Sequence, residues 1–358
     1  MTKKKLTAAL SVLIILVLGL WVPSPYLIER PGPTVNTLGS IDISGEVSPV
    51  VTVSGVETFE GSGELRLLTV SVVGNPENRL GWLTLFPTLF DPTQTVVRLD
   101  TVFGEGVGVD ERDELNALMM QNSQKNAIAA ALRELDKEFE SNVIVNSVLP
   151  NAPAAGLLQD GDLFLTVDGD PVASNEALRE YISALDVGST VVFEVLRDNK
   201  TIDIEVETGG SDGSNRSVIG VLLETEYEFP VEVDILLEGI GGPSAGLVFA
   251  LAIYELLTES DFTDGLTVSG TGTVDDEGNV GAIGGVTQKL WGAKRAGSEL
   301  FLLPETNCKD LPEKLPTNMS IVPIKTVGEA IAAISDFDRK SLVSNFVACD
   351  ELLARSYG

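Results

Sequence analysis

Hydrophobic residues dominate the segment Leu6–Val22, which directly follows three lysines at positions 3–5. A run of this length reaches the lower limit of about 17 residues for a helix that spans a bilayer core. A cleavable signal peptide is the alternative, but Trp21 and two prolines stand where an Ala-x-Ala cleavage motif would follow. We therefore predict an uncleaved transmembrane helix at residues 1–25, with the lysines on the inside.

Short β-rich runs follow and are separated by glycine and proline; they lie at Val50–Val53, Leu65–Val73 and Thr95–Leu99. This pattern is typical of strands joined by turns. The next segment, Asp110–Leu135, carries a polar face and indicates a helix. We predict a small β-rich domain at residues 26–135 that ends in this helix. We expect the helix to have a structural role.

The next pattern indicates one strand, an amphipathic helix and two paired strands. These elements lie at Leu163–Val167, Asn175–Leu185, Val191–Leu196 and Ile202–Val206. We predict that they form a domain at residues 136–208. Residues 209–215, which are rich in glycine and serine, form a flexible linker to the next domain.

Strands alternate with helices in most of the remaining chain, which predicts an α/β layout. The expected strands lie at Val218–Leu223, Pro230–Leu237, Thr267–Thr273, Leu300–Leu303 and Ser320–Pro323. We predict a domain at residues 216–340 and a C-terminal tail at residues 341–358. The fold class is therefore mixed α/β and α+β, in several domains.

A glycine turn in this last domain leads into a helix that is apolar on most faces. Gly241, Gly242 and Pro243 place Ser244 at or next to the helix start. Unpaired N–H groups and the positive end of the helix dipole stabilise a developing oxyanion at such a position. The alternative is that Ser244 only caps the helix, and the segment alone favours that interpretation.

Composition changes this balance, because the 358 residues include no histidine. That absence excludes a Ser-His-Asp triad, papain-type Cys-His chemistry and metal sites that contain histidine. A nucleophilic serine would need another base, and lysine is the known alternative. Lys289 lies at a helix start after a second glycine turn. We expect no metal and no cofactor. We also expect no ATPase, because no Gly-x-x-x-x-Gly-Lys-[Ser/Thr] motif occurs.

Three motifs resemble the proteolytic domain of Lon proteases: Gly-Gly-Pro-Ser-Ala-Gly around Ser244, Thr-Gly at Thr271, and Gly-Ala-Ile-Gly-Gly-Val-Thr-Gln-Lys ending at Lys289. The resemblance implies that Ser244 is the nucleophile, Lys289 the general base, and Thr271 the residue that positions this dyad. We add the backbone N–H groups of Gly242, Ser244 and Ala245 as candidates to hold the oxyanion, because Pro243 has none. The sequence departs from many Lon proteases at Gly241, where they carry an acidic residue.

A second resemblance covers Val143–Val172, which is similar to PDZ domains of the bacterial protease type. Such domains add a peptide as a strand and hold its C-terminal carboxylate in a glycine-containing loop. That loop should precede Val143, but the acidic run Arg133–Ser141 stands there. Peptide binding and a spacer without carboxylate capture are both open alternatives.

Together these features resemble the bacterial membrane-anchored, PDZ-containing Lon-like proteases. The resemblance implies an ATP-independent serine endopeptidase with a Ser-Lys dyad that acts on protein or peptide substrates. It implies a single-pass protein of the cell membrane with extracytoplasmic domains, and a homo-oligomer in the form of a hexameric ring. The alternative is a non-catalytic PDZ and Lon-like scaffold that binds partner proteins.

Charge and cysteine content complete the sequence analysis. The net charge of −29 argues against nucleic-acid binding, because phosphate repulsion would be unopposed. Cys308 and Cys349 are the only cysteines, and both follow the predicted anchor, in a space expected to be oxidising. We predict that they form a disulfide; two unrelated buried thiols are the alternative.

Overall fold

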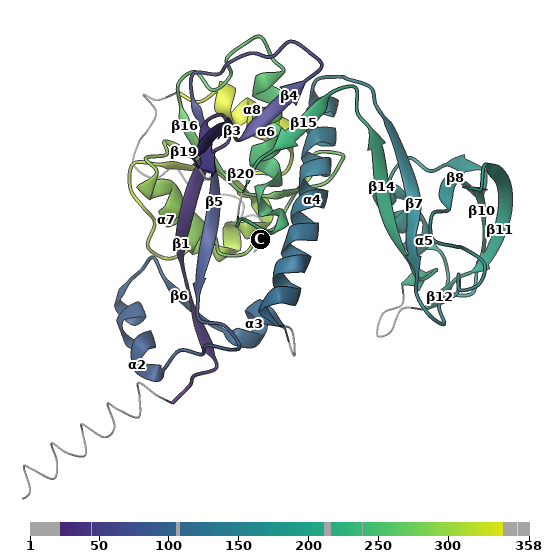
Figure 1. Ribbon diagram of the computed structural model, residues 1–358, viewed down its shortest axis with the longest axis horizontal. Helices are drawn as coiled ribbons and strands as arrows, with labels where there is room; N and C mark the ends of the chain where they lie inside the picture. The colour runs from purple at the N-terminus through teal and green to yellow at the C-terminus, as the bar shows by residue number, and fades with distance from the viewer. Residues whose placement is uncertain are drawn as a thin grey trace, which may run out of the picture. The chain divides into compact units, whose positions relative to one another are not determined.

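The computed structural model describes residues 22–43, 45–104, 108–210, 216–237, 239–338 and 349. The chain forms two compact units: Met1–Lys137 together with Val231–Gly358, and Glu138–Pro230. The second unit is therefore an insertion between two parts of the first unit (Figure 1). In the part of the chain that the structure describes, no helix is long and apolar enough to cross a bilayer. The predicted anchor, up to Trp21, lies outside the described residues.

A six-stranded mixed sheet forms the centre of the first unit, in the order β20-β19-β16-β5-β1-β6. Its strands are β1 (Tyr26–Asn36), β5 (Glu64–Val73), β6 (Thr95–Arg98), β16 (Thr267–Gly270), β19 (Leu300–Pro304) and β20 (Ser320–Ile324). The four strands from β20 to β5 are parallel, whereas β1 runs antiparallel to both β5 and β6. The sheet thus combines strands from both ends of the chain.

The pairing of β5 with β16 differs from the separate β-rich domain expected at residues 26–135. Glu64 lies opposite Thr267 and Leu67 lies opposite Gly270, in parallel register. Leu65, Leu67 and Leu68 of β5 are buried within the same sheet. Hydrophobic patterning indicates that a strand is buried but not which strand it pairs with, so the sequence did not reveal this shared sheet.

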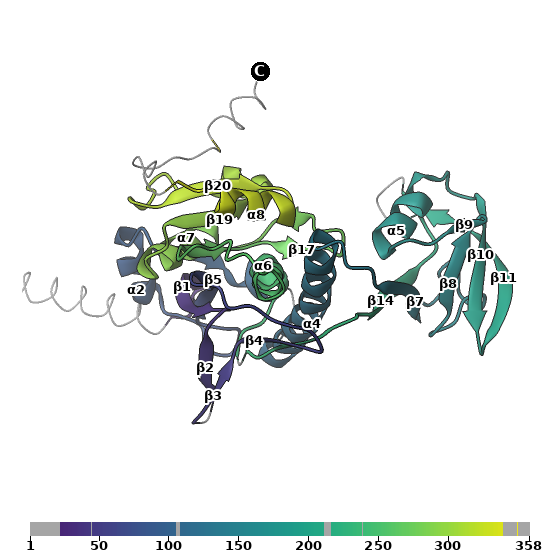
Figure 2. The ribbon, with the colours of Figure 1, turned by 90° about the horizontal axis from the view of Figure 1, so that it is seen from above.

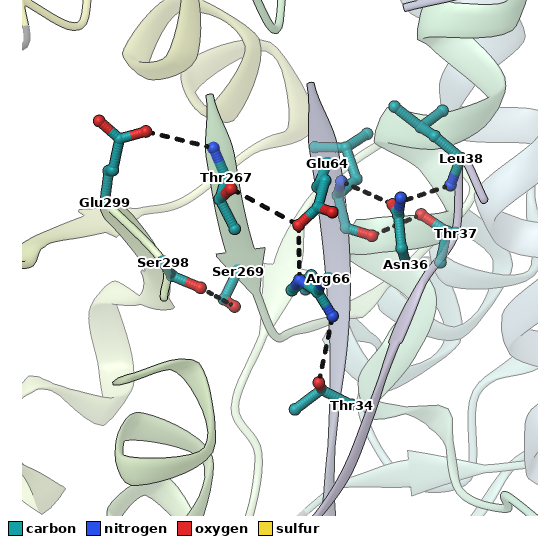
Figure 3. A network of polar contacts seen from close by, with 11 residues as sticks. Thr34, Asn36, Thr37, Leu38, Glu64, Arg66, Thr267, Ser269, Ser298 and Glu299 are labelled. Atoms are coloured by element: carbon teal, nitrogen blue, oxygen red, sulfur yellow. Dashed lines mark hydrogen bonds and ion pairs between the residues drawn. The ribbon is translucent and has the colours of Figure 1, made fainter. Parts of the chain in front are cut away.

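Polar side chains also connect the N-terminal strands to the C-terminal half of the sheet (Figure 3). Glu64 of β5 accepts a hydrogen bond from Arg66 Nε at 2.8 Å and one from Thr267 Oγ1 of β16 at 3.5 Å. Two residues after Thr267 along β16, the hydroxyl of Ser269 lies 2.6 Å from that of Ser298. Since Ser269 is buried, this paired hydroxyl satisfies a group that would otherwise lose its solvation.

The helices of the first unit are α2 (Trp82–Leu85), α3 (Leu99–Phe103), α4 (Val109–Glu134), α6 (Gly246–Leu256), α7 (Val286–Arg295) and α8 (Val327–Ser335). The 3-10 turns are η1 (Phe86–Phe90), η2 (Pro243–Ala245) and η3 (Glu305–Asp310). Helix α6 is almost entirely buried and packs against α4, α8 and strands β5 and β16, whereas α7 packs against β1 and β5 (Figure 2). The predicted helix Asp110–Leu135 is α4, and it packs against α6 and α8.

Short β pairs complete the first unit. They are the hairpin of β2 (Ser40–Ile43) and β3 (Glu46–Pro49), the pair of β4 (Val51–Ser54) and β15 (Glu232–Ile235), and the hairpin of β17 (Thr273–Val274) and β18 (Val280–Gly281). In the β4–β15 pair, Val51 lies opposite Ile235. The first strand after the second unit therefore pairs with a strand from the N-terminal part of the first unit.

The second unit contains a five-strand path in the order β11-β10-β8-β7-β14, with β9 beside β8. Its elements are β7 (Glu140–Val148), β8 (Leu163–Val167), β9 (Asp170–Pro171), α5 (Asn175–Ala184), β10 (Thr190–Arg197), β11 (Lys200–Glu207), β12 (Gly209–Gly210), β13 (Ser217–Val218) and β14 (Val221–Glu228). Ser174 caps α5 by accepting the N–H of Ala177 at 3.0 Å. Phe164, Leu178 and Phe193 lie in the core.

The unit extends beyond the predicted boundary at residue 208. Strand β14 pairs with β7 along its length, from Val221 opposite Val148 to Glu228 opposite Glu140. The predicted strand Val218–Leu223 therefore belongs here and not to the last domain. Apolar alternation in this strand shows that one face is buried, but only the long-range pairing with β7 assigns it to this sheet.

Candidate active site

Ser244 lies in the 3-10 turn η2, directly before the buried helix α6. Gly242 begins this turn with φ 93°, a conformation that side-chain-bearing residues rarely adopt. Helix α6 begins at Gly246, and Ala245 occupies its N-cap position. Ser244 is half-buried and precedes the cap, so the structure does not support the interpretation of Ser244 as the cap of α6.

Helix α4 holds the serine turn in place through two hydrogen bonds. Ser123 Oγ donates to the carbonyl of Pro243 at 2.9 Å, and the Gly242 N–H donates to the carbonyl of Asn116 at 3.0 Å. The second bond corrects one prediction, because the Gly242 N–H is occupied and is not available to an oxyanion. The N–H groups of Ser244 and Ala245 stay as candidates.

The same helix explains why residue 241 is glycine. A Cβ atom at Gly241 would lie 2.8 Å from the Cβ of Asn116, closer than real Cβ contacts allow. An acidic side chain at this position, as many Lon proteases carry, would therefore displace α4. Gly246 is also restricted, since a Cβ there would lie 2.8 Å from Ser123 Oγ.

Lys289 and Thr271 form a hydrogen bond next to this turn. Lys289 lies on α7, which follows Gly285 in the left-handed region, and its side chain is only 3% exposed. Its Nζ donates to Thr271 Oγ1 at 2.9 Å. The Thr271 hydroxyl in turn donates to the carbonyl oxygen of Ser244 at 3.1 Å. The three residues predicted from the motifs are thus joined by two successive hydrogen bonds.

Burial lowers the pKa of Lys289 from 10.5 to about 7. The cause is desolvation, which disfavours the charged ammonium, and the nearby Glu29 carboxylate raises the pKa in the opposite direction. Burial also raises the pKa of Glu29, a residue of β1 whose proximity the sequence analysis missed. At neutral pH a large fraction of Lys289 is therefore uncharged, as a general base requires.

A cleft of ≈ 380 Å³ lies beside the serine turn. One wall is the α4 surface around Met119, Asn122 and Asn126, and the opposite wall is the β17–β18 hairpin. Pro243, the residue before Ser244, also lines this cleft. Helix α4, expected to be structural only, thus both supports the turn and borders the space next to it.

The two cysteines that were predicted to pair, Cys308 and Cys349, form a disulfide, which links η3 to the C-terminal segment. Across the described ranges, no group of three or more His, Cys, Asp and Glu side chains is arranged to hold a metal ion.

The inserted unit presents an edge strand beside a helix. Strand β14 ends its sheet and contacts α5, and the loop before it contains Ile219 and Gly220. Gly220 has φ 74°, and a Cβ atom there would lie 2.2 Å from the Cβ of Ala152. The glycine-containing apolar loop expected before Val143 is thus found downstream, in Val-Ile-Gly-Val at residues 218–221. The run itself was visible in the sequence, but its place beside β7 was not.

Family models match part of each unit, and the match in the inserted unit begins before Glu138 and ends before β14. The model of the Lon protease (S16) C-terminal proteolytic domain matches residues 239–335, and a PDZ domain model matches residues 106–208. The Lon protease of Brucella suis is 40% identical over 93 residues, which cover 25% of this chain and 11% of that protein. The archaeal Lon protease of Methanocaldococcus jannaschii is 35% identical over 107 residues, 30% of this chain and 16% of that protein. The chain therefore spans only a small part of these relatives' length.

Among solved structures, the PDZ domain of the SdrC-like protein from Listeria monocytogenes is 30% identical, with a TM-score of 0.23, and covers 24% of this chain and 92% of that one. The two family models show that the chain contains a PDZ domain and a Lon-type C-terminal proteolytic domain.

Proposed function

We propose that the protein is an ATP-independent serine endopeptidase that uses Ser244 as nucleophile and Lys289 as general base. The observation that carries this proposal is the buried lysine, whose Nζ reaches the Ser244 turn through Thr271. The Thr271 hydroxyl gives its proton to the Ser244 carbonyl and therefore accepts from Lys289. This arrangement leaves the lone pair of a neutral Lys289 for the Ser244 hydroxyl.

In the proposed reaction, Lys289 takes the hydroxyl proton as Ser244 Oγ attacks the peptide carbonyl. The N–H groups of Ser244 and Ala245, at the start of α6, stabilise the negative oxygen of the tetrahedral intermediate. Lys289 then gives the proton to the leaving amine, and an ester joins Ser244 to the acyl half. Water hydrolyses this ester with Lys289 again acting as base.

A fluorophosphonate probe tests the nucleophile and separates the enzyme from the scaffold alternative. We expect the wild-type protein to be labelled on Ser244, and the Ser244→Ala variant to be unlabelled and unable to cleave an unfolded protein substrate. Ser183→Ala is the control, because it removes an exposed serine hydroxyl of the inserted unit that takes no part in the proposed site, and this variant should still be labelled. A folded wild-type protein that stays unlabelled over the pH range 7–9 would support the scaffold.

We also propose that residues 1–25 anchor the protein in the cell membrane, with residues from Tyr26 onward outside the cytoplasm. The support is the sequence pattern of three lysines before the apolar run Leu6–Val22. Protease added to intact cells should then digest the chain, and a cytoplasmic marker should stay intact in the same sample. Digestion only after lysis would contradict this orientation. A hexameric ring stays a prediction from the resemblance.

The PDZ unit is proposed to bind extended peptide segments beside β14, the edge strand next to α5. The residues that flank it, Lys137 and Val231, both belong to the first unit, and its core is separate. Replacing Glu138–Pro230 with a short glycine linker should therefore keep fluorophosphonate labelling of Ser244 but slow the turnover of a protein substrate. Loss of labelling in a folded deletion variant would show that the active site needs this unit.

A further inference from the structure

Four large apolar side chains lie exposed on the α2–η1 segment: Trp82, Phe86, Leu89 and Phe90. We name this set the apolar platform. Leu85 and Thr88 of the same segment are buried, so the segment has a clear inner and outer face. Phe86 and Phe90 contact each other edge to face, with their ring centroids 5.4 Å apart. Apolar residues that are exposed singly are normal on protein surfaces. A contiguous exposed cluster of large apolar side chains, in contrast, marks an interaction surface.

The platform is attached to the point where the predicted anchor ends. Pro23 pairs with Gly81, the residue before Trp82, and the Ser24 N–H donates to the carbonyl of Leu80 at 2.8 Å. The Trp82 ring packs edge to face on Tyr26, at the start of β1. Val22, the last residue of the apolar run Leu6–Val22, is thus next to a residue that pairs with the platform segment. If the predicted span lies in a bilayer, the short chain length between them places the platform about 10 Å or less from the bilayer surface.

The chemistry of the segment fits a lipid surface. Residues 80–90 read Leu-Gly-Trp-Leu-Thr-Leu-Phe-Pro-Thr-Leu-Phe and contain no charged residue, in a chain of net charge −29. Anionic lipid surfaces repel such an acidic chain, and this segment carries no carboxylate to add to the repulsion. Tryptophan and other aromatic side chains are stabilised at the boundary of headgroups and acyl chains.

We propose that the apolar platform inserts into the outer interface of the membrane and fixes the proteolytic unit against the lipid surface. This inference rests on the proposed membrane anchoring. It adds a second contact besides the anchor, so the unit would hold one orientation and not move freely on a tether. The partner is a lipid bilayer; a second copy of this chain is the competing occupant.

Site-specific fluorescence in proteoliposomes tests the platform. Leu89→Cys and Val47→Cys are matched variants, because each replaced side chain is 70% exposed. Val47 lies on the β2–β3 hairpin, which follows the far end of β1 and is separate from α2 in both views (Figures 1 and 2). The full-length proteins carry an environment-sensitive thiol label, and labelled wild-type protein gives the background from the native cysteines. Phe90→Cys provides a second platform position.

Labels at positions 89 and 90 should lose emission in vesicles whose acyl chains carry bromine near the headgroup, relative to unbrominated vesicles, and the label at position 47 should not. Equal emission at position 89 in both kinds of vesicle, from protein that floats with vesicles after alkaline extraction, would overturn the platform and leave the anchor intact. A shift that depends on protein density and not on bromine would assign the platform to a second copy. Failure of the protein to float would reject both the anchor and the platform, whereas fluorophosphonate labelling tests the protease independently.

Discussion

Lys289→Arg is expected to lower kcat/KM for a peptide substrate by about 10²–10⁴-fold, the usual contribution of a general base. Arginine keeps the positive charge and similar length, but its pKa is so high that it cannot accept the serine proton near neutrality. Burial works in the opposite direction for lysine and lowers the pKa of Lys289 to about 7. The variant therefore removes the base and keeps a cation.

The same shift predicts the pH profile of the wild-type protein. Lys289 must be uncharged to act, so kcat/KM should rise with pH and reach half of its plateau near pH 7, well below the 10.5 of an unperturbed lysine. Weakening the opposing electrostatic effect of Glu29, as in Glu29→Gln, should move this midpoint to lower pH. Initial rates at low substrate concentration over pH 5.5–9 measure both midpoints.

Lys294→Arg is the matched control, because Lys294 lies on the same helix α7 and its ammonium bonds to the Thr317 carbonyl. This variant should keep wild-type rates and the same midpoint. Wild-type proteolysis by a folded Lys289→Arg protein would show that another group accepts the proton. Circular dichroism establishes that both variants are folded.

Cys308→Ser is expected to lower the free energy of unfolding by about 4 kcal/mol, according to the chain-entropy model of a cross-link. The disulfide joins residues separated by 41 positions, and its removal frees that loop in the unfolded chain. Both sulfur atoms lie in the hydrophobic cluster that includes Leu303 and Met319. Urea unfolding of the full chain in detergent, followed by far-UV circular dichroism, measures the loss.

Cys349→Ser and the double variant are the controls. All three should lose the same stability, because each breaks the same bond, and the double variant should lose no more than either single one. Thiol titration of the unreduced, denatured wild-type protein should find no free thiol. Two free thiols, or additive effects of the two substitutions, would show that the cysteines act separately.

The sequence was most informative where a function depends on local chemistry. The glycine turn before Ser244, the turn before Lys289 and the absence of histidine could be read without coordinates. The same is true of α5, which needs only an amphipathic pattern and the capping Ser174. Such features depend on residues a few positions apart, which patterning and propensity describe directly.

The domain boundaries were less accessible, because they depend on which distant strands pair. Strand β5 was expected in a domain of its own, but it pairs with β16, some two hundred residues further along the chain. Strand β14 was expected to precede the serine turn as part of the last domain, and it completes the sheet of the inserted unit. Backbone pairing of this kind leaves no periodic signal that names the partner strand.

For this protein, the sequence alone determined the candidate catalytic groups: a serine and a lysine on two glycine-led turns, with a threonine between them in the chain and no histidine. Tertiary structure decided the surroundings of these groups. It buried Lys289 against Thr271, within the electrostatic influence of Glu29, and it paired the Gly242 N–H with a carbonyl of α4. The physical reason is that a pKa and a free hydrogen-bond donor depend on the desolvation and contacts that distant segments provide, and a motif contains neither.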